Sequence, residues 1–179
     1  MNVYTKGNIE LLKEKNLISV AGSRKITQES IIWLEKAFNE LKSDAVIISG
    51  LALGTDTIAH KLALEMGFKQ IAVLPTGFNK ITPKRNIPLA KEIISDDGLL
   101  LSEYSSNTGL LDNNQYIDRN KIIAKIGTYL IMPQCDRYSG TMHTVNYIQK
   151  QNKPIILPNS SFSGNQFIIN NDKYVSVVF

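Results

Sequence analysis

Short apolar segments rich in Val and Ile alternate along the chain with segments of helical spacing. Each apolar run leads through a turn into a segment whose apolar residues recur every three or four positions, which is typical of βαβ units. The predicted strands are residues 17–21, 45–49, 70–74, 99–102, 128–132 and 154–157, and the predicted helices are residues 27–42, 56–66, 87–95, 119–126 and 140–151. The sequence therefore predicts an α/β fold in which helices cover both faces of an open, mostly parallel sheet.

The remaining segments carry weaker patterns. Thr27 is a good N-cap for the first predicted helix, whose buried stripe is expected to comprise Ile31, Leu34, Phe38 and Leu41. Residues 103–118 are rich in Ser and Asn and are expected to be irregular. The alternating run 174–179 predicts one more strand at an edge of the sheet.

Length and composition narrow the class of protein. The 179 residues, 43% of them hydrophobic, predict one domain over residues 1–179. No apolar run approaches the roughly 20 residues of a membrane helix, and the polar first turns lack a signal-peptide core, so we expect a cytoplasmic protein without membrane contact. Twenty Lys and Arg against sixteen Asp and Glu give a net charge of +4, which permits an anionic partner without requiring one.

Few residues are available for metal or thiol chemistry. Because Cys135 is the one cysteine, an internal disulfide cannot form. With two histidines, a zinc site would need carboxylates among its ligands. We therefore expect no metal, no cofactor and a structural role for Cys135. His60 lies one turn after Asp56 and is expected to hydrogen-bond it or to stabilise the helix start.

Small and polar residues gather where strands lead into helices. They occupy positions 22–24, 49–55, 76–77 and 139–141. Each turn alone can be explained by turn geometry, but the carboxyl ends of parallel strands meet at one edge of the sheet, so four such junctions predict an anion-binding rim. Neither a G-x-G-x-x-G fingerprint nor a G-x-x-x-x-G-K-[ST] loop is present, which argues against ordinary dinucleotide binding and P-loop nucleotide hydrolysis.

Several motifs together resemble, in order and spacing, the Rossmann-like domain of the DprA/Smf family of DNA-processing proteins, which belongs to the SLOG superfamily. They are VAGSR at 20–24, ISGLA at 48–52 with Gly54, Asp56, Ala59 and His60, IAVL at 71–74 with Gly77, Pro83 and Asn86, LSEY at 101–104, RNKIIA at 119–124, and SGT at 139–141 with Thr144. The resemblance covers residues 15–158 and leaves 159–179 as a C-terminal extension.

The resemblance implies a non-enzymatic protein that holds the phosphate backbone of single-stranded DNA in a basic pocket at the strand ends. It also implies a homodimer and contact with a RecA-type recombinase during DNA uptake and recombination. Carried over by motif, the binding residues would be Gly22, Ser23, Arg24, Ser49, Gly50, Leu51, Arg119, Asn120, Lys121, Ser139, Gly140 and Thr141. Lys80, with Lys84 and Arg85, could extend the basic track, and Phe78 and Tyr104 are candidate platforms for bases.

The chain departs from the family pattern at several positions. Leu53 and Lys121 stand where the family has Arg, and Gln134 to Asp136 replace its acidic residue. Fewer fixed cations should weaken DNA binding. Glu103 is expected to hold Arg24 or Arg119 in place, and the apolar residues Ile168 and Ile169, with 174–179, are candidates for the dimer interface.

Two alternatives use the same rim. A SLOG-type sensor would bind a small nucleotide instead of DNA. A LOG-type nucleoside monophosphate phosphoribohydrolase needs a catalytic Glu at the start of the last helix, where this sequence has Thr144. Because a hydroxyl cannot do the acid–base work of a carboxylate, the hydrolase is the weaker alternative.

Overall fold

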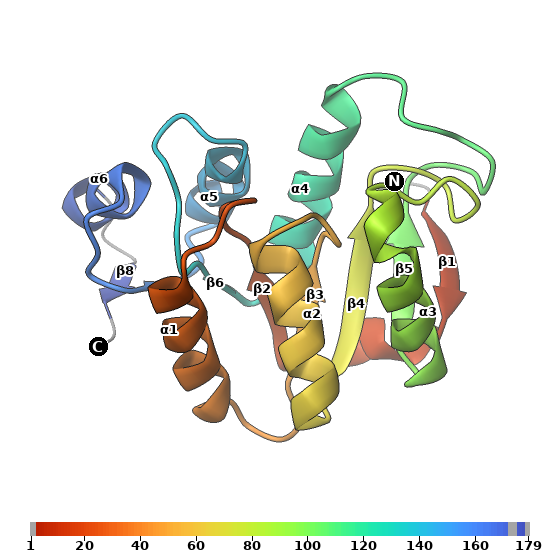
Figure 1. The fold of residues 1–179 in the computed structure, drawn as a ribbon, viewed down its shortest axis with the longest axis horizontal. Coiled ribbons are helices and arrows are strands. Elements are labelled where there is room, and N and C mark those ends of the chain that lie inside the picture. The colour runs from red at the N-terminus through yellow and green to blue at the C-terminus, as the bar shows by residue number, and fades with distance from the viewer. Residues whose placement is uncertain (1–2, 172–174, 178–179) are drawn as a thin grey trace.

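One mixed sheet forms the centre of the protein (Figure 1). In this computed structural model, which describes residues 3–171 and 175–177, the sheet has eight strands in the order β1-β5-β4-β3-β2-β6-β7-β8. The strands are β1 Tyr4–Gly7, β2 Leu17–Val20, β3 Val46–Ser49, β4 Lys69–Leu74, β5 Leu99–Ser102, β6 Tyr129–Ile131, β7 Ile155–Leu157 and β8 Val175–Val177. Among these strands only β1 is antiparallel to its neighbour, β5, so the predicted parallel α/β architecture is confirmed.

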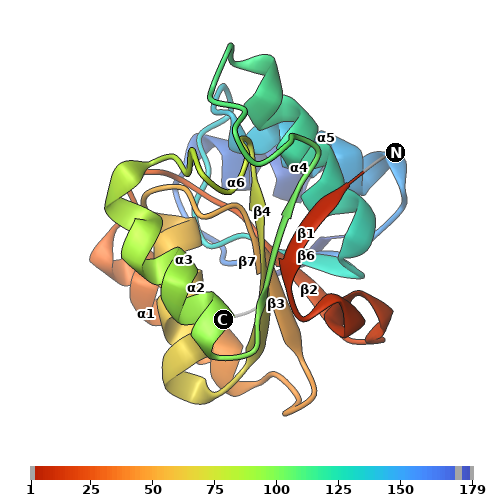
Figure 2. The same cartoon turned by 90° about the vertical axis from the view of Figure 1, so that its right-hand side faces the viewer.

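Helices cover both faces of the sheet (Figure 2). On one face lie α1 Gln28–Asn39, α2 Thr55–Met66 and α3 Ile87–Ser95, and on the other lie α4 Asn114–Ile126 and α5 Thr141–Lys150. The helix α6 Ser163–Asn171 packs Ile168 into the apolar cluster of α5 and β7. Two short 3₁₀ helices, η1 Ile9–Lys13 and η2 Lys84–Asn86, complete the elements. No helix among the described residues is long and apolar enough to cross a membrane.

Helix boundaries differ from the predicted ones by more than one residue in two places. The side chain of Thr27 does cap α1 by accepting from the amide of Ser30, but the helix ends at Asn39 instead of residue 42. Its buried side includes Trp33 and Ala37, whereas Ile31 and Leu41 are only half-buried. The helix α4 begins at residue 114, five positions before the predicted start at 119, because its polar first turn carries no apolar periodicity.

Besides the short helix η2, three elements were not predicted at all. The strand β1 and the helix η1 precede the first predicted strand, and α6 lies in the C-terminal extension 159–179. β1 forms an exposed edge with one half-buried residue in four, so it shows none of the alternation that identifies a strand. The predicted strand near the C-terminus is confirmed for Val175–Val177, while residues 174, 178 and 179 lie outside the described residues.

The strand order places a topological switch point next to β2. The connection after β2 leads into α1 on one face, and the connection after the neighbouring β6 leads into α5 on the opposite face. Loops that diverge in this way open a crevice at the carboxyl ends of the two strands, where α/β proteins bind ligands.

Candidate functional site

A pocket of about 560 Å³ lies at this switch point. It is bounded by the turn after β2, the loop after β6 and the first turns of α4 and α5. Of the thirteen predicted binding residues, eight line it, namely Gly22, Ser23, Arg24, Arg119, Asn120, Ser139, Gly140 and Thr141. The chain therefore brings together the turn after β2 and the N-termini of α4 and α5, which are far apart in the sequence.

The turn formed by Gly22, Ser23 and Arg24 is fixed from two sides. The amide of Ser23 donates to the carbonyl oxygen of Gln134 at 2.9 Å, and the amide and hydroxyl of Thr55 both donate to the carbonyl oxygen of Ser23 at 3.0 Å. A Cβ atom on Gly22 would stand 2.5 Å from the Thr55 hydroxyl oxygen, so the close approach of these segments requires glycine. The turn is a rigid support for the side chain that follows it.

Arg24 projects from this turn into the pocket mouth. Its side chain is exposed, and its guanidinium carbon lies 5.1 Å from the centre of the Tyr116 ring. None of the four ion pairs found among the described residues includes Arg24. Its charge is therefore available to an anion, with an aromatic ring holding the guanidinium in orientation.

Gln134 explains one departure from the family pattern. Its side-chain oxygen accepts from the amide of Thr27 at 2.9 Å, and its side-chain nitrogen donates to the carbonyl oxygen of Lys25 at 3.2 Å. An ionised carboxylate could accept the first hydrogen bond but could not donate the second. The amide thus holds the chain between Arg24 and α1 with both of its polar atoms.

Arg119 lies in the interior between the pocket and α2. Its Nη1 atom is 3.0 Å from Oδ2 of Asp56, and the two side chains are 6% and 7% exposed. The same carboxylate oxygen accepts from the amide of Ala52 at 3.2 Å. The expectation that Glu103 would hold Arg119 is wrong, because the guanidinium forms its ion pair with Asp56 on α2.

Gly50 leaves the space that the ion pair between Arg119 and Asp56 occupies. A Cβ atom at Gly50 would overlap Nη1 of Arg119 at 1.0 Å and would stand 2.8 Å from Oδ2 of Asp56. The glycine therefore makes room for the guanidinium, which lies across the backbone at the end of β3.

The other predicted binding residues lie away from the pocket. Ser49 is buried and its hydroxyl donates to the carbonyl oxygen of Val20 at 2.8 Å, while Leu51 is fully buried in the core. Lys121 is exposed on α4, with Nζ 2.6 Å from Oδ1 of Asp118, and Lys80 is exposed in the loop after β4. None of these four lines the pocket.

The two predicted aromatic platforms are engaged elsewhere. Phe78 packs against the apolar cluster of α3 and β4, and the hydroxyl of Tyr104 donates to Oδ2 of Asp118 at 3.3 Å. Tyr116 on α4, within the residues predicted to be irregular, is the aromatic residue that lines the pocket.

The N-terminus of α5 forms the opposite wall. Gly140 occupies the N-cap position and no side chain caps the helix. The hydroxyl of Thr141 donates to the carbonyl oxygen of Gly22 at 2.9 Å, so this side chain ties α5 to the turn after β2. The amides of Met142 and His143 donate to the carbonyl oxygens of Ser139 and Gly140, and the dipole of this ten-residue helix favours an anion in front of its N-terminus.

Cys135 has no nucleophilic character. Its side chain is buried, and burial raises the pKa of the thiol to about 11, so it stays protonated near neutral pH. The structure contains no group of three His, Cys, Asp or Glu residues that could hold a metal ion, as far as its described residues reach.

His60 does not pair with Asp56, contrary to one of the two expectations. Its Nδ1 atom lies 2.8 Å from Oε1 of Gln70, and its ring is fully buried. Burial is the main cause that lowers the pKa of His60, the nearby Arg119 adds to it, and Gln70 and Asp56 oppose it. The folded protein therefore holds this ring neutral near pH 7.

This burial predicts an acid-sensitive stability. The unfolded chain binds a proton at His60 below its ordinary pKa of about 6.5, whereas the folded chain does so only at lower pH, so stability is lost as pH falls through that window. The expected slope reaches at most about 1.4 kcal/mol per pH unit. Urea unfolding between pH 7.5 and 5 should show this loss in the wild type. His60→Asn keeps a polar partner for Gln70 without titrating, and an equal loss in that variant would contradict the assignment.

Comparison with known proteins places the chain in a family. A family model described as DNA recombination-mediator protein A matches residues 1–174. The DNA processing protein DprA of Streptococcus pneumoniae is 35% identical over 163 residues, which are 90% of this chain and 57% of that protein. Protein Smf of Synechocystis is 34% identical over 145 residues, 80% of this chain and 36% of that protein. The chain thus spans about half the length, or less, of these relatives.

Solved structures agree with the sequence matches. DprA from S. pneumoniae superposes with a TM-score of 0.89 at 31% identity, covering 98% of this chain and 62% of that one. DprA from Helicobacter pylori superposes with a TM-score of 0.84 at 29% identity, covering 99% of this chain and 81% of that one. That structure is described as giving insight into a unique single-stranded DNA binding mode. Because the family model covers nearly the whole chain and the fold superposes on that of DprA, the chain belongs to the DNA recombination-mediator protein A family of DprA and Smf proteins.

Proposed function

We propose that this chain binds single-stranded DNA by its phosphate backbone, without catalysis, in the pocket at the switch point. The observation that carries the proposal is Arg24, an exposed guanidinium that is held on a rigid turn and has no carboxylate partner in the described part of the chain. The uncapped start of α5 stands across the pocket from it. A cation and helix amides suit the phosphates of a strand held independently of base sequence.

The charge of the pocket supports modest affinity. Its lining includes the cations Arg24, Lys25 and Arg119 and the anions Asp56 and Asp136, and Arg119 is neutralised by Asp56. Leu53, where the family has Arg, is 40% exposed beside Arg24 in a small adjoining cavity of about 80 Å³. Few phosphates are therefore neutralised, and binding should be tightest at low salt.

A titration with a fluorescent oligothymidine tests the proposal. Fluorescence anisotropy at a series of salt concentrations should show binding whose log K falls linearly with log[salt], with a slope of about −0.7 for each phosphate neutralised. Oligocytidine of equal length should bind with a similar slope. Absence of binding at low salt would overturn the proposal.

A second candidate function is supported by the pocket itself. Its volume of about 560 Å³ lies within the range of small-molecule sites, so a small nucleotide could occupy it in place of a DNA strand. A thermal-shift panel of mononucleotides and cyclic nucleotides separates the two. A nucleotide that raises the melting temperature of a protein that does not bind oligothymidine would favour the sensor.

Hydrolysis of a nucleoside monophosphate is less well supported. Thr144, at the place of the catalytic Glu in the related hydrolases, is buried in the pocket wall and supplies no carboxylate. Release of free base from AMP or CMP would revive this alternative.

We also propose self-association and contact with a RecA-type recombinase, because the family resemblance implies both. Sedimentation equilibrium and a pull-down with the recombinase test them separately. Of the expected interface residues, Ile168 is fully buried in the core, so the expectation is wrong for this residue. Ile169 packs against the same cluster but is only half-buried, and it stays a candidate.

A further inference from the structure

The loop between β6 and α5 is fastened to α6. The amide of Cys135 donates to Oδ1 of Asn165 at 2.8 Å, and the amide of Arg137 donates to the hydroxyl oxygen of Ser163 at 3.1 Å. Gly164 donates its amide to the carbonyl oxygen of Cys135, and a Cβ atom at Gly164 would stand 2.6 Å from that oxygen. Three consecutive residues of α6 thus support a loop that borders the pocket.

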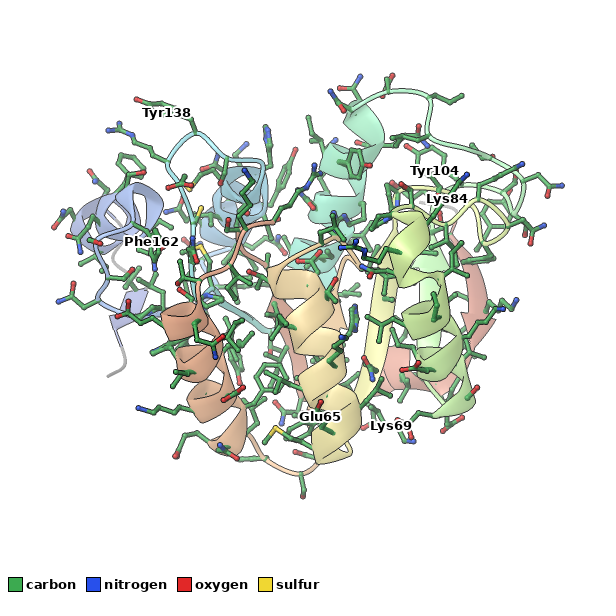
Figure 3. All side chains as sticks on the ribbon, viewed as in Figure 1. Glu65, Lys69, Lys84, Tyr104, Tyr138 and Phe162 are labelled. Atoms are coloured by element: carbon green, nitrogen blue, oxygen red, sulfur yellow. The ribbon has the colours of Figure 1, made fainter. Side chains whose placement is uncertain are left out.

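Two side chains at the tip of this loop face outward. Tyr138 is 94% exposed, and Figure 3 shows it at the outermost point of the loop, directed away from the body of the protein. Arg137 is also exposed, and its guanidinium carbon lies 4.2 Å from the centre of the Phe167 ring on α6 and 5.7 Å from that of Tyr138. No ion pair among the described residues includes Arg137.

The position of Arg137 and Tyr138 beside the pocket indicates what these two side chains could bind. The residues on either side, Asp136 and Ser139, line the pocket, whereas Arg137 and Tyr138 stand on its outer border. A strand whose phosphates meet Arg24 and the start of α5 would leave the pocket past this border. An exposed ring beside a cation that pairs with no carboxylate among the described residues matches the two groups of a single strand, its bases and its phosphates.

We propose that Tyr138 stacks a base and that Arg137 holds a phosphate of single-stranded DNA just outside the pocket, which lengthens the binding track. This inference rests on the proposed function, because it needs a strand in the pocket. The Phe167 ring and the backbone contacts to α6 keep Arg137 and the loop in place before the strand arrives. The loop and the Arg137 side chain therefore lose little conformational entropy when DNA binds.

Tyr138→Ala and Tyr138→Phe test the stacking. Tyr138→Ala should weaken binding of a long oligothymidine by roughly fivefold or more, since a stacked base is worth at least that much, whereas Tyr138→Phe keeps the ring and should stay within about twofold of the wild type. The loss should shrink toward none for the shortest oligothymidine that still binds. Tyr4→Ala, on β1 at the opposite edge of the sheet, is the matched control.

Arg137→Ala should lower the salt slope by about 0.7. Thermal unfolding of Tyr138→Ala and Tyr138→Phe should match the wild type, because the Tyr138 side chain is 94% exposed.

The outcomes separate this inference from the proposed function. A wild type that does not bind oligothymidine would overturn both. If the wild type binds and Arg24→Ala does not, but Tyr138→Ala binds every length as the wild type does, the platform alone is overturned. If Tyr138→Ala lowers the sedimentation coefficient and leaves the affinity unchanged, the ring is a contact between copies and the platform is again overturned.

Discussion

Arg119→Ala is expected to lower the free energy of unfolding by about 3–5 kcal/mol, which is the cost of leaving one member of a buried ion pair without its partner. Asp56 is 7% exposed, and the guanidinium is the counter-charge that its carboxylate meets in the interior. The amide of Ala52 is the other donor to the same carboxylate oxygen, and one amide does not replace a charge. Urea unfolding at pH 7 measures the loss.

A double-mutant cycle shows whether the loss belongs to the pair. Asp56→Asn can still accept from the amide of Ala52 but is uncharged, and it should rescue part of the stability that Arg119→Ala removes, so that the two effects are not additive. Lys121→Ala, on the same helix but with an exposed ion pair, is the matched control and should cost less than about 1 kcal/mol. An Arg119→Ala variant as stable as this control would mean that water reaches the Asp56 carboxylate.

The interior position of Arg119 changes what its motif means. The resemblance assigns Arg119 to a DNA phosphate. In the structure, however, Nη1 of Arg119 pairs with Asp56, and the buried Nε atom has no hydrogen-bond partner among the described residues. A weaker affinity in Arg119→Ala would therefore combine a lost contact with a loosened pocket wall. Arg24, whose removal disturbs no ion pair, is the residue on which the binding proposal can be tested cleanly.

The sequence predicts the parallel strands well because each is buried on both faces. Strands such as Val46–Ser49 and Leu99–Ser102 are entirely buried and read as unbroken apolar runs. The edge strand Tyr4–Gly7 is mostly exposed, and α6 is half polar, so neither leaves a pattern of apolar residues to detect. The polar first turn of α4 hides the start of that helix for the same reason.

The rim was predictable as a set of junctions, but the roles within it were not. The turn after β2 and the start of α5 meet as expected, because parallel strands align their carboxyl ends. The pairing of Arg119 with Asp56 joins residues 63 positions apart, and no local pattern indicates it. Ser49 and Leu51 belong to the same motif as Gly50, yet the side chains of the first two turn into the core, while the glycine supports the guanidinium.

Arg24→Ala should weaken binding of single-stranded DNA roughly ten- to a hundredfold, as expected when a hydrogen-bonded charge worth about 1.5–3 kcal/mol is lost. The salt slope should fall by about 0.7, because one phosphate fewer is neutralised. The folded state should be little affected, since Arg24 is exposed and the turn that carries it is held by its backbone.

Two further variants show whether charge or geometry matters at this position. Arg24→Lys keeps the charge but loses the planar fork that meets two phosphate oxygens and stacks on Tyr116, so it should recover the salt slope but only part of the affinity. Lys36→Ala removes an equal charge from the last turn of α1, away from the pocket, and should change neither. If Lys36→Ala weakened binding as much as Arg24→Ala, the DNA would be responding to the net charge of +4 and not to a built site at the switch point. A loss confined to Arg24→Ala, and equal for oligothymidine and oligocytidine, is the result that a site for the backbone requires.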